Sequence, residues 1–409
     1  MLQIARRSAA LRAHARSASS FSDLELSMWQ KGAAAYSKTF GGVTSQAVDA
    51  LLDGAGVERQ RIAQAKAVYS VAPASFPKFN APAHPNPKVE PDEALFKDKV
   101  PETAAFSVLD VATGPGYVAL GAAARGATKV VGVDTSVAMI EEAKQYLAFE
   151  KGLRVHRATP IENISFAVGD AAKLPADDNS FDAVVMGFVL LHLPDPAAAL
   201  KEAFRVLKPG GKLSFSVWEP PPKNRGFEIL NDAIAAHGNA NVELPGAPLP
   251  FFHFADAANA SSALGDAGFD AASVQVTSIP CTAALEQPDD LFQMFATATA
   301  RSRAMLEAQT PEQLAAIRNA MADTVGTKYH GVHLAHLSTQ HNDGNAPNRQ
   351  TAGDAHHVAI AGTDAPMHDG SLSGRNPYQL PMPCVVVAAT KPGGKAAAAP
   401  KPKKAKKAA

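Results

Sequence analysis

The chain has 409 residues, which is enough for a large buried core and for more than one domain. Its formal net charge is zero, but residues 1–22 carry four arginines and no acid, and residues 391–409 carry seven lysines and no acid. The rest of the chain holds 28 basic and 39 acidic residues, a net charge of −11, which argues against nucleic acid as its partner.

Cysteine usage and hydropathy exclude two further classes. The only cysteines, Cys281 and Cys384, cannot build a disulfide framework or a zinc cluster, and their apolar surroundings predict small core residues. The longest apolar stretch, Ala183 to Leu193, is well short of the ~20 residues that a membrane span needs.

Residues 1–22 are rich in Arg, Ser and Ala and can form a basic amphipathic helix. This composition is typical of a mitochondrial transit peptide and predicts a matrix location. A plastid leader, or a non-cleaved extension on a cytoplasmic protein, is the alternative.

The next two segments differ sharply in pattern. Trp29–Val57 predicts one or two helices that end at Gly54 and Gly56, so residues 23–57 form an N-terminal helical unit. Residues 58–105 contain seven prolines and no sustained period, which predicts a linker or surface insertion.

From Phe106 strands and helices alternate, and this predicts a parallel sheet with helices on both faces. The expected strands are Phe106–Val111, Lys129–Val133, Ile164–Val168, Ala183–Val189 and Leu213–Trp218. The expected helices start near Gly116, at Ser136 and after the N-cap Asp195, the last one ending at Lys208–Gly211.

After Trp218 strands and helices no longer alternate regularly. We expect a helix over Phe227–His237, an aromatic loop at 251–254, a helix over Ala257–Ala267, a strand over Val274–Ile279, two more helices and a final strand over Leu380–Thr390. The second of the two helices opens with the capping-box pattern Thr310-Pro311-Glu312-Gln313. Residues 220–256 and 288–324 read as helical insertions on the substrate side.

Residues 328–377 hold seven of the 13 histidines. Nothing in their spacing fixes a metal geometry, so we interpret the stretch as a biased, disordered insertion and predict no metal site. The expected domain plan is a main domain over 106–327 that is closed by the strand in 378–390 and followed by a lysine-rich tail, 391–409.

The run from Val108 to Tyr117 combines a buried strand, a glycine-rich turn and a helix start. Gly114, Gly116 and Ala119 fit the dinucleotide pattern G-x-G-x-x-A, and Asp134 is placed to bind a ribose. Asp110 would repel a pyrophosphate and attract an ammonium group. The ligand that combines adenine, ribose and a cationic amino-acid end is S-adenosylmethionine.

Asp170 is the third acid at the end of a predicted strand and could accept a hydrogen bond from the adenine amine. The alternative for each acid is that it caps the next helix. Because the three acids lie at three successive strand ends on the ligand-binding edge, we favour ligand binding over helix capping.

Segments 110–127, 132–144, 169–195 and 204–219 resemble the class I S-adenosylmethionine-dependent methyltransferases, within them the group of ubiquinone and menaquinone C-methyltransferases. The resemblance implies a doubly wound, seven-stranded α/β sheet, Rossmann-like, with an antiparallel last strand and a helical lid. It implies S-adenosylmethionine as methyl donor, bound by ten residues: Asp110, Ala112, Gly114, Gly116, Asp134, Thr135, Met139, Asp170, Ala171 and Gly187. Ala112 departs from the usual pattern, which has glycine there.

The acceptor side is less defined. His192 follows the fourth strand and could accept a proton or cap the adjoining loop, and Trp29, Tyr36 and Phe40 form an aromatic stripe that favours a core role. We expect a small, largely apolar methyl acceptor, with the oligomeric state left open. The alternatives are an NAD(P)-dependent oxidoreductase and a non-catalytic cofactor-binding assembly factor.

Overall fold

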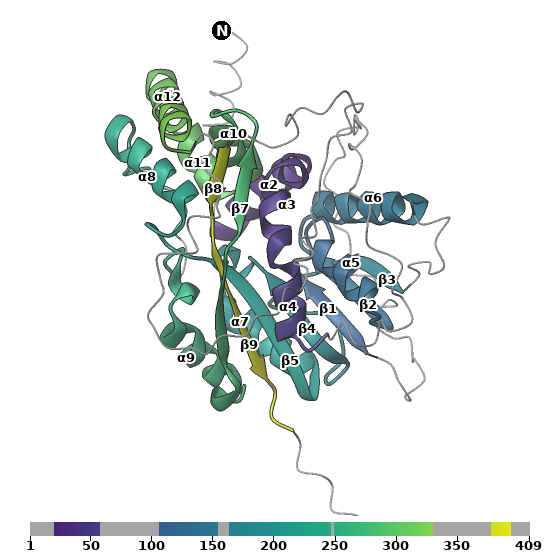
Figure 1. Cartoon of the computed structure of the whole chain (residues 1–409). Helices are drawn as coiled ribbons and strands as arrows, with labels where there is room; N and C mark the ends of the chain where they lie inside the picture. Colours follow the sequence, from purple (N-terminus) through teal and green to yellow (C-terminus); the bar gives the residue numbers. More distant parts are fainter. Residues whose placement is uncertain (1–19, 58–105, 154–162, 247–248, 330–377, 394–409) are drawn as a thin grey trace, which may run out of the picture.

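The computed structural model describes residues 20–57, 106–153, 163–246, 249–329 and 378–393 (Figure 1). The predicted insertion 58–105, nearly all of 328–377, leader residues 1–19 and the tail from residue 394 lie outside these ranges.

A seven-stranded sheet in the order β3-β2-β1-β4-β5-β9-β6 forms the centre of the described structure. Its strands are β1 (Ser107–Val111), β2 (Lys129–Asp134), β3 (Ile164–Val168), β4 (Phe181–Gly187), β5 (Leu207–Trp218), β6 (Gln275–Ile279) and β9 (Cys384–Thr390). Strands β1 to β5 pair in parallel, and β9 runs antiparallel to both β5 and β6. The predicted mostly parallel sheet with an antiparallel last strand is confirmed.

Helices cover this sheet as a doubly wound fold requires. They are α4 (Val48–Gly54), α5 (Tyr117–Ala124), α6 (Val137–Leu153), α7 (Pro196–Val206) and α9 (Ala257–Ala267). Helix α4 packs on β4, β5 and β9, and α5 packs on β1 and β2 (Figure 1). Helix α7 starts as predicted, because Asp195 Oδ1 accepts a hydrogen bond from the Ala198 N–H at 2.8 Å and Pro196 occupies the first turn.

A second group of elements gathers above the sheet in Figure 1. It consists of α2 (Phe21–Lys38), α3 (Phe40–Thr44), η1 (Ser45–Ala47), α8 (Arg225–His237), α10 (Asp290–Ala298), α11 (Arg301–Glu307), α12 (Pro311–Lys328), and the two-stranded sheet of β7 (Thr282–Leu285) and β8 (Tyr378–Pro381). The capping box at the start of α12 is confirmed, since Thr310 and Gln313 exchange both hydrogen bonds.

Two helix predictions need correction. The first helix begins at Phe21 rather than Trp29, because the Ser20 hydroxyl accepts a hydrogen bond from the Asp23 N–H and caps it. Of the residues that the sequence assigned to the leader, Ser20 therefore caps this helix, and Phe21 and Ser22 lie in its first turn. Three helices, not two, lie between 288 and 328, because Thr299 takes an extended conformation that separates α10 from α11.

The final strand, predicted as one element, is two. Pro381 and Pro383 have no N–H to donate, so the ladder breaks between β8 and β9. Strand β8 then pairs with β7, while β9 enters the main sheet.

The bounds of two further strands differ from the prediction. Strand β4 ends at Gly187, before the predicted Val189, because Phe188 has a left-handed backbone (φ +54°). Strand β5 begins at Leu207, before the predicted Leu213, with a register shift between Phe181 and Ala183 of the paired β4.

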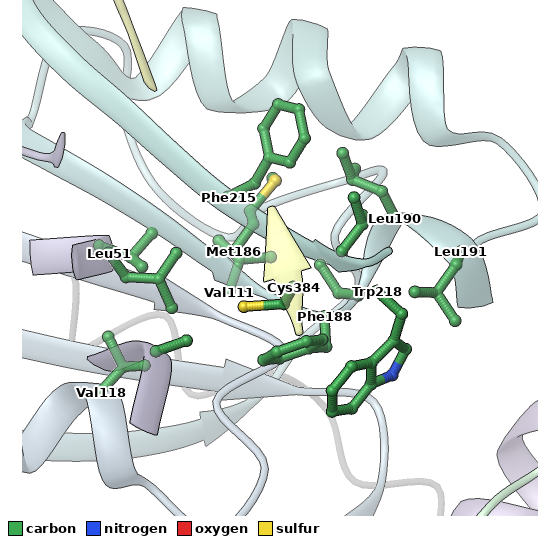
Figure 2. Packing of buried hydrophobic residues seen from close by; sticks show 14 of the residues in the cluster. Leu51, Val111, Val118, Met186, Phe188, Leu190, Leu191, Phe215, Trp218 and Cys384 are labelled. Carbon is green, nitrogen blue, oxygen red and sulfur yellow. The ribbon is translucent and has the colours of Figure 1, made fainter. Parts of the chain in front are cut away.

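The core beneath the sheet's carboxyl edge is rich in large side chains. Figure 2 shows Phe188 and Trp218 next to each other, and their ring centroids are 4.4 Å apart. Met186 and Cys384 are fully buried in the same cluster. Cys281 is also buried, with its Sγ atom 3.7 Å from that of Cys384, so both cysteines are core residues as predicted.

Candidate active site

A cavity of about 280 Å³ lies at the carboxyl ends of the parallel strands and is roofed by α2, α3 and α4. Nine of the ten predicted cofactor residues line it: Asp110, Ala112, Gly114, Asp134, Thr135, Met139, Asp170, Ala171 and Gly187. His192 and the aromatic stripe of Trp29, Tyr36 and Phe40 line it as well. The topology thus brings segments far apart in sequence into one site.

Gly116 is the predicted residue that the structure does not bring to the cavity. It precedes α5 with φ +86°, and a Cβ atom there would come within 3.0 Å of the Phe166 ring. Gly116 is therefore needed for the turn and for packing. Gly114 differs, since it lines the cavity with φ +52° and a Cβ atom there would meet no atom of the described residues within 4 Å. This leaves room for a ligand against the Gly114 backbone.

Ala112 lies in the same loop with φ +55°. An alanine in this left-handed region carries a steric cost that glycine avoids. The departure from the family pattern thus changes the side chain but keeps the backbone conformation that a glycine would favour.

Asp110 is almost fully buried at the end of β1. Its Oδ2 atom accepts hydrogen bonds from Thr113 Oγ1 at 2.6 Å and from the Ala119 N–H at 3.0 Å. Its Oδ1 atom has no hydrogen-bond partner among the described residues, but it is not completely shielded from solvent. It therefore remains accessible from the cavity. Burial raises the pKa of Asp110 to about 7, and the Asp134 carboxylate adds to the rise against the hydrogen bonds of Thr113 and Ala119.

Asp134 ends β2 and is also buried. Its Oδ2 accepts a hydrogen bond from the Gly114 N–H at 3.0 Å and its Oδ1 accepts one from the Ser136 N–H at 2.8 Å. Burial raises the pKa of Asp134 to about 6, and these two hydrogen bonds limit the rise. Each oxygen keeps a lone pair that a ligand hydroxyl could use.

Asp170 follows β3 and is more exposed. Its Oδ1 accepts a hydrogen bond from the Ala172 N–H at 2.9 Å, its Oδ2 has no partner among the described residues, and the residue lines the cavity. All three acids therefore bond to the backbone of the turn or helix that follows, as the capping interpretation expected, and all three also line the cavity. The two interpretations are compatible.

The other end of the cavity is aromatic. Phe188, Trp218, Phe227 and Phe251 line it together with the stripe on α2 and α3. The sequence favoured a core role for that stripe, and the structure shows that its three residues also line the cavity. Tyr36 donates or accepts a hydrogen bond with Thr44 at 2.8 Å, and burial raises its pKa to about 12, so it stays neutral.

Sequence reasoning missed Glu25, which lines the cavity from α2 and is 4% exposed. Glu25 Oε2 lies 3.0 Å from His192 Nδ1 and accepts a 3.0 Å hydrogen bond from Trp29 Nε1. The available signal was the carboxylate at position 25 between the apolar residues Leu24 and Met28 of the same helix. Arg301 and Ser302 also line the cavity without a sequence signal that could have indicated it.

No group of three or more His, Cys, Asp or Glu side chains in the described part of the chain is placed to hold a metal ion. None of the described helices is both long and apolar enough to cross a membrane.

Comparisons with known proteins agree with this geometry. Residues 109–215 match the family model described as a methyltransferase domain. The chain is 35% identical over 165 residues to the ubiquinone/menaquinone biosynthesis C-methyltransferase of Desulfotalea psychrophila, covering 37% of this chain and 62% of the relative. It is 44% identical over 105 residues to the demethylmenaquinone methyltransferase of Staphylococcus epidermidis, covering 25% of this chain and 39% of the relative. The chain thus spans less than two thirds of each of these relatives.

Among solved structures, phosphoethanolamine N-methyltransferase 2 of Haemonchus contortus in complex with S-adenosyl-L-methionine aligns with a TM-score of 0.34 at 16% identity. The alignment covers 71% of this chain and 50% of that one.

Proposed function

We propose that the chain is a class I S-adenosylmethionine-dependent methyltransferase that transfers a methyl group from S-adenosylmethionine to a small, largely apolar molecule. The proposal is supported by the match of residues 109–215 to the methyltransferase-domain family model and by the similarity to the C-methyltransferase of Desulfotalea psychrophila. Neither alternative from the sequence, a nicotinamide-dependent oxidoreductase or a non-catalytic assembly factor, gains support from the family match.

The observation that carries the proposal is the order of three carboxylates across adjacent strands. Asp170, Asp134 and Asp110 follow or end β3, β2 and β1, which are consecutive in the sheet. Neighbouring strands are about 4.8 Å apart, so the three ends span roughly 10 Å. Adenine, ribose and the amino-acid end of S-adenosylmethionine come in the same order, with the open Gly114 backbone at the turn.

Each group of the donor then has a residue of suitable chemistry. Asp170 Oδ2 can accept from the adenine amine, Asp134 from the ribose hydroxyls and Asp110 Oδ1 from the ammonium group. When bound, S-adenosylmethionine supplies a methyl group on a sulfonium for in-line displacement. The protein's part is to align the reactants and exclude water, which the roof of α2 to α4 allows. A pyrophosphate beside the Asp110 carboxylate would be repelled.

The acceptor end favours a planar, mostly apolar ring. It begins over β4 at Gly187 and is lined by aromatic side chains from several separate segments, among them Trp29, Phe188, Trp218 and Phe251. Such a lining suits an aromatic molecule by stacking and edge contacts. The two relatives above are named for quinone biosynthesis, and we propose a quinol-like acceptor on both grounds.

The experiment is incubation of cell extract with the full chain and S-adenosylmethionine carrying an isotope-labelled methyl group, followed by mass spectrometry. We expect a labelled small molecule that depends on the protein and is lost with Asp134→Ala. Label in protein or nucleic acid alone, or an equal yield with the variant, would contradict the proposal.

We also propose that the protein enters mitochondria, on the basic, acid-free composition of residues 1–22. A fluorescent reporter carrying residues 1–22 should co-localise with mitochondria, and a version with its four arginines changed to glutamate should not. A reporter that stays in the cytosol would refute this proposal and leave methyl transfer untouched.

A further inference from the structure

A pair of titratable side chains, His192 and Glu25, lies at the acceptor end of the cavity. His192, in the turn η4 (Leu190–His192) after β4, lies with Nδ1 3.0 Å from Glu25 Oε2 on α2. Its ring also meets Trp29 edge-on at 5.0 Å and Phe251 at 6.2 Å between ring centroids. His192 is therefore fixed from two sides, at the point where the roof meets the sheet.

The second nitrogen of His192 is left for a ligand. Nε2 has no hydrogen-bond partner among the described residues, and it is not completely shielded from solvent. The side chain is 16% exposed and lines the cavity. If Nδ1 carries the proton and donates it to Glu25, Nε2 presents a lone pair toward the acceptor.

Glu25 is unusual for a structural residue. Its Oε2 takes both contacts, from Trp29 Nε1 and from His192, while its Oε1 is buried without a hydrogen-bond partner in the described part of the chain. A half-satisfied buried carboxylate is costly, and it becomes less costly when a positive charge forms beside it. A proton arriving on His192 would create that charge.

We propose that His192 Nε2 accepts the proton that the methyl acceptor loses, and that Glu25 is a positioning residue that holds the Nδ1–H tautomer. The inference rests on the proposed function. The acceptor's O–H or ring C–H bond breaks and its proton passes to Nε2. The new bond to the methyl carbon forms as the carbon–sulfur bond breaks, with that electron pair remaining on sulfur. His192 later returns the proton to solvent.

The charged groups around His192 come from several elements. Glu25 faces it from α2, while Asp110, Asp134, Asp170 and Arg301 line the same cavity. Turn η5 (His253–Ala255) packs on η4 and carries His253, next to Asn259, and helix α7 carries the capping Asp195. Of the charged groups on the described residues, only Glu25 makes a direct contact with the imidazole.

The tautomer can be measured without knowing the acceptor. We suggest nitrogen NMR of the full chain labelled with ¹⁵N-histidine and saturated with S-adenosylhomocysteine, with the His192 signals assigned by their loss in His192→Gln. We expect Nδ1 protonated and Nε2 bare in the neutral imidazole. A bare Nδ1 would overturn the proposal.

Two variants test the role of Glu25. Glu25→Gln replaces the carboxylate with an amide that can donate as well as accept, and should allow His192 to populate the tautomer with a bare Nδ1. Trp29→Phe removes a competing donor to Oε2 and should leave Nδ1 protonated. The matched control is Glu142→Gln, which loses another carboxylate contact of α2, the 3.0 Å hydrogen bond from Ser37 Oγ, and should leave the His192 signals unchanged.

In the labelled-methyl assay, His192→Gln should reduce turnover by about 100-fold, the size of a lost general base, and leave S-adenosylhomocysteine affinity unchanged. A His192 tautomer that does not change in Glu25→Gln, or full turnover with His192→Gln, would overturn the inference. If S-adenosylhomocysteine fails to bind the wild-type protein, the proposed function fails instead, and the tautomer can still be read in the free protein.

Discussion

The buried carboxyl of Asp110 allows a prediction in which folding stability and ligand binding respond oppositely. Asp110→Asn keeps the shape of the side chain and an oxygen that can accept the hydrogen bonds from Thr113 and Ala119, but it removes the titrating group. Asp110 has a folded-state pKa of about 7 against an ordinary value of 3.8. The native state therefore holds this proton more tightly than the unfolded chain does.

The sign follows from linkage. A carboxyl group whose pKa is raised by folding stabilises the native state fully at pH values below its unfolded-state pKa. This contribution is lost as the pH rises through its folded-state pKa. One pKa unit corresponds to about 1.4 kcal/mol. Between about pH 5 and pH 8 the wild-type protein should thus lose roughly 3 kcal/mol of unfolding free energy through this group. The Asp110→Asn protein should lack that loss.

The assay is urea unfolding of both proteins without ligand at the two pH values. The wild-type protein should lose stability relative to Asp110→Asn as the pH rises, while its affinity for S-adenosylhomocysteine should increase, because the ligand's ammonium favours the ionised carboxyl. The variant should bind weakly, without that pH dependence. If the unfolding free energies of the two proteins change by the same amount between the two pH values, Asp110 is not a buried titrating group.

Three other substitutions test separate parts of the structure. Asp134→Ala should weaken S-adenosylhomocysteine binding by about 1–3 kcal/mol in calorimetry, because ribose hydroxyls would lose their acceptor in a closed site; unchanged affinity would place the ribose elsewhere. Arg125, which is 5% exposed and donates to Asp49, Asp53 and the Val57 carbonyl, anchors α4 to α5. Arg125→Met should lower unfolding free energy by about 1–3 kcal/mol, since both acids are partly solvated, and an unaltered urea midpoint would show that α4 needs no such anchor. Met186→Ala, at a fully buried position in β4, should cost about 2–5 kcal/mol by leaving a cavity; a loss below 1 kcal/mol would mean that the core collapses to fill it.

The parallel sheet was predictable because its strands are short apolar runs that alternate with helices. Strand β3 has the predicted bounds, Ile164–Val168, and strand β2 extends the predicted one by a single residue to Asp134. Strand ends were less predictable. The left-handed Phe188 that ends β4 has no local sequence signal, because a bulky residue takes that conformation only when its surroundings require it.

The donor half of the site was predictable for a similar reason. The loop after β1 and the acids after β2 and β3 are each local to one strand, so strand order alone brings them together. The acceptor half was not, because Glu25 meets His192 across 167 positions of sequence. That contact depends on how α2 docks over the sheet, which no local pattern encodes. Trp29, Tyr36 and Phe40 were ambiguous in sequence because they serve both the core and the cavity wall.

The most direct test of the methyltransferase assignment is a pair of calorimetric titrations of the full chain at about pH 8, where Asp110 is ionised, one with S-adenosylhomocysteine and one with NAD. Binding of S-adenosylhomocysteine with no preference for NAD is the predicted result. Tighter binding of NAD would contradict the assignment of the three carboxylates to adenine, ribose and an ammonium group.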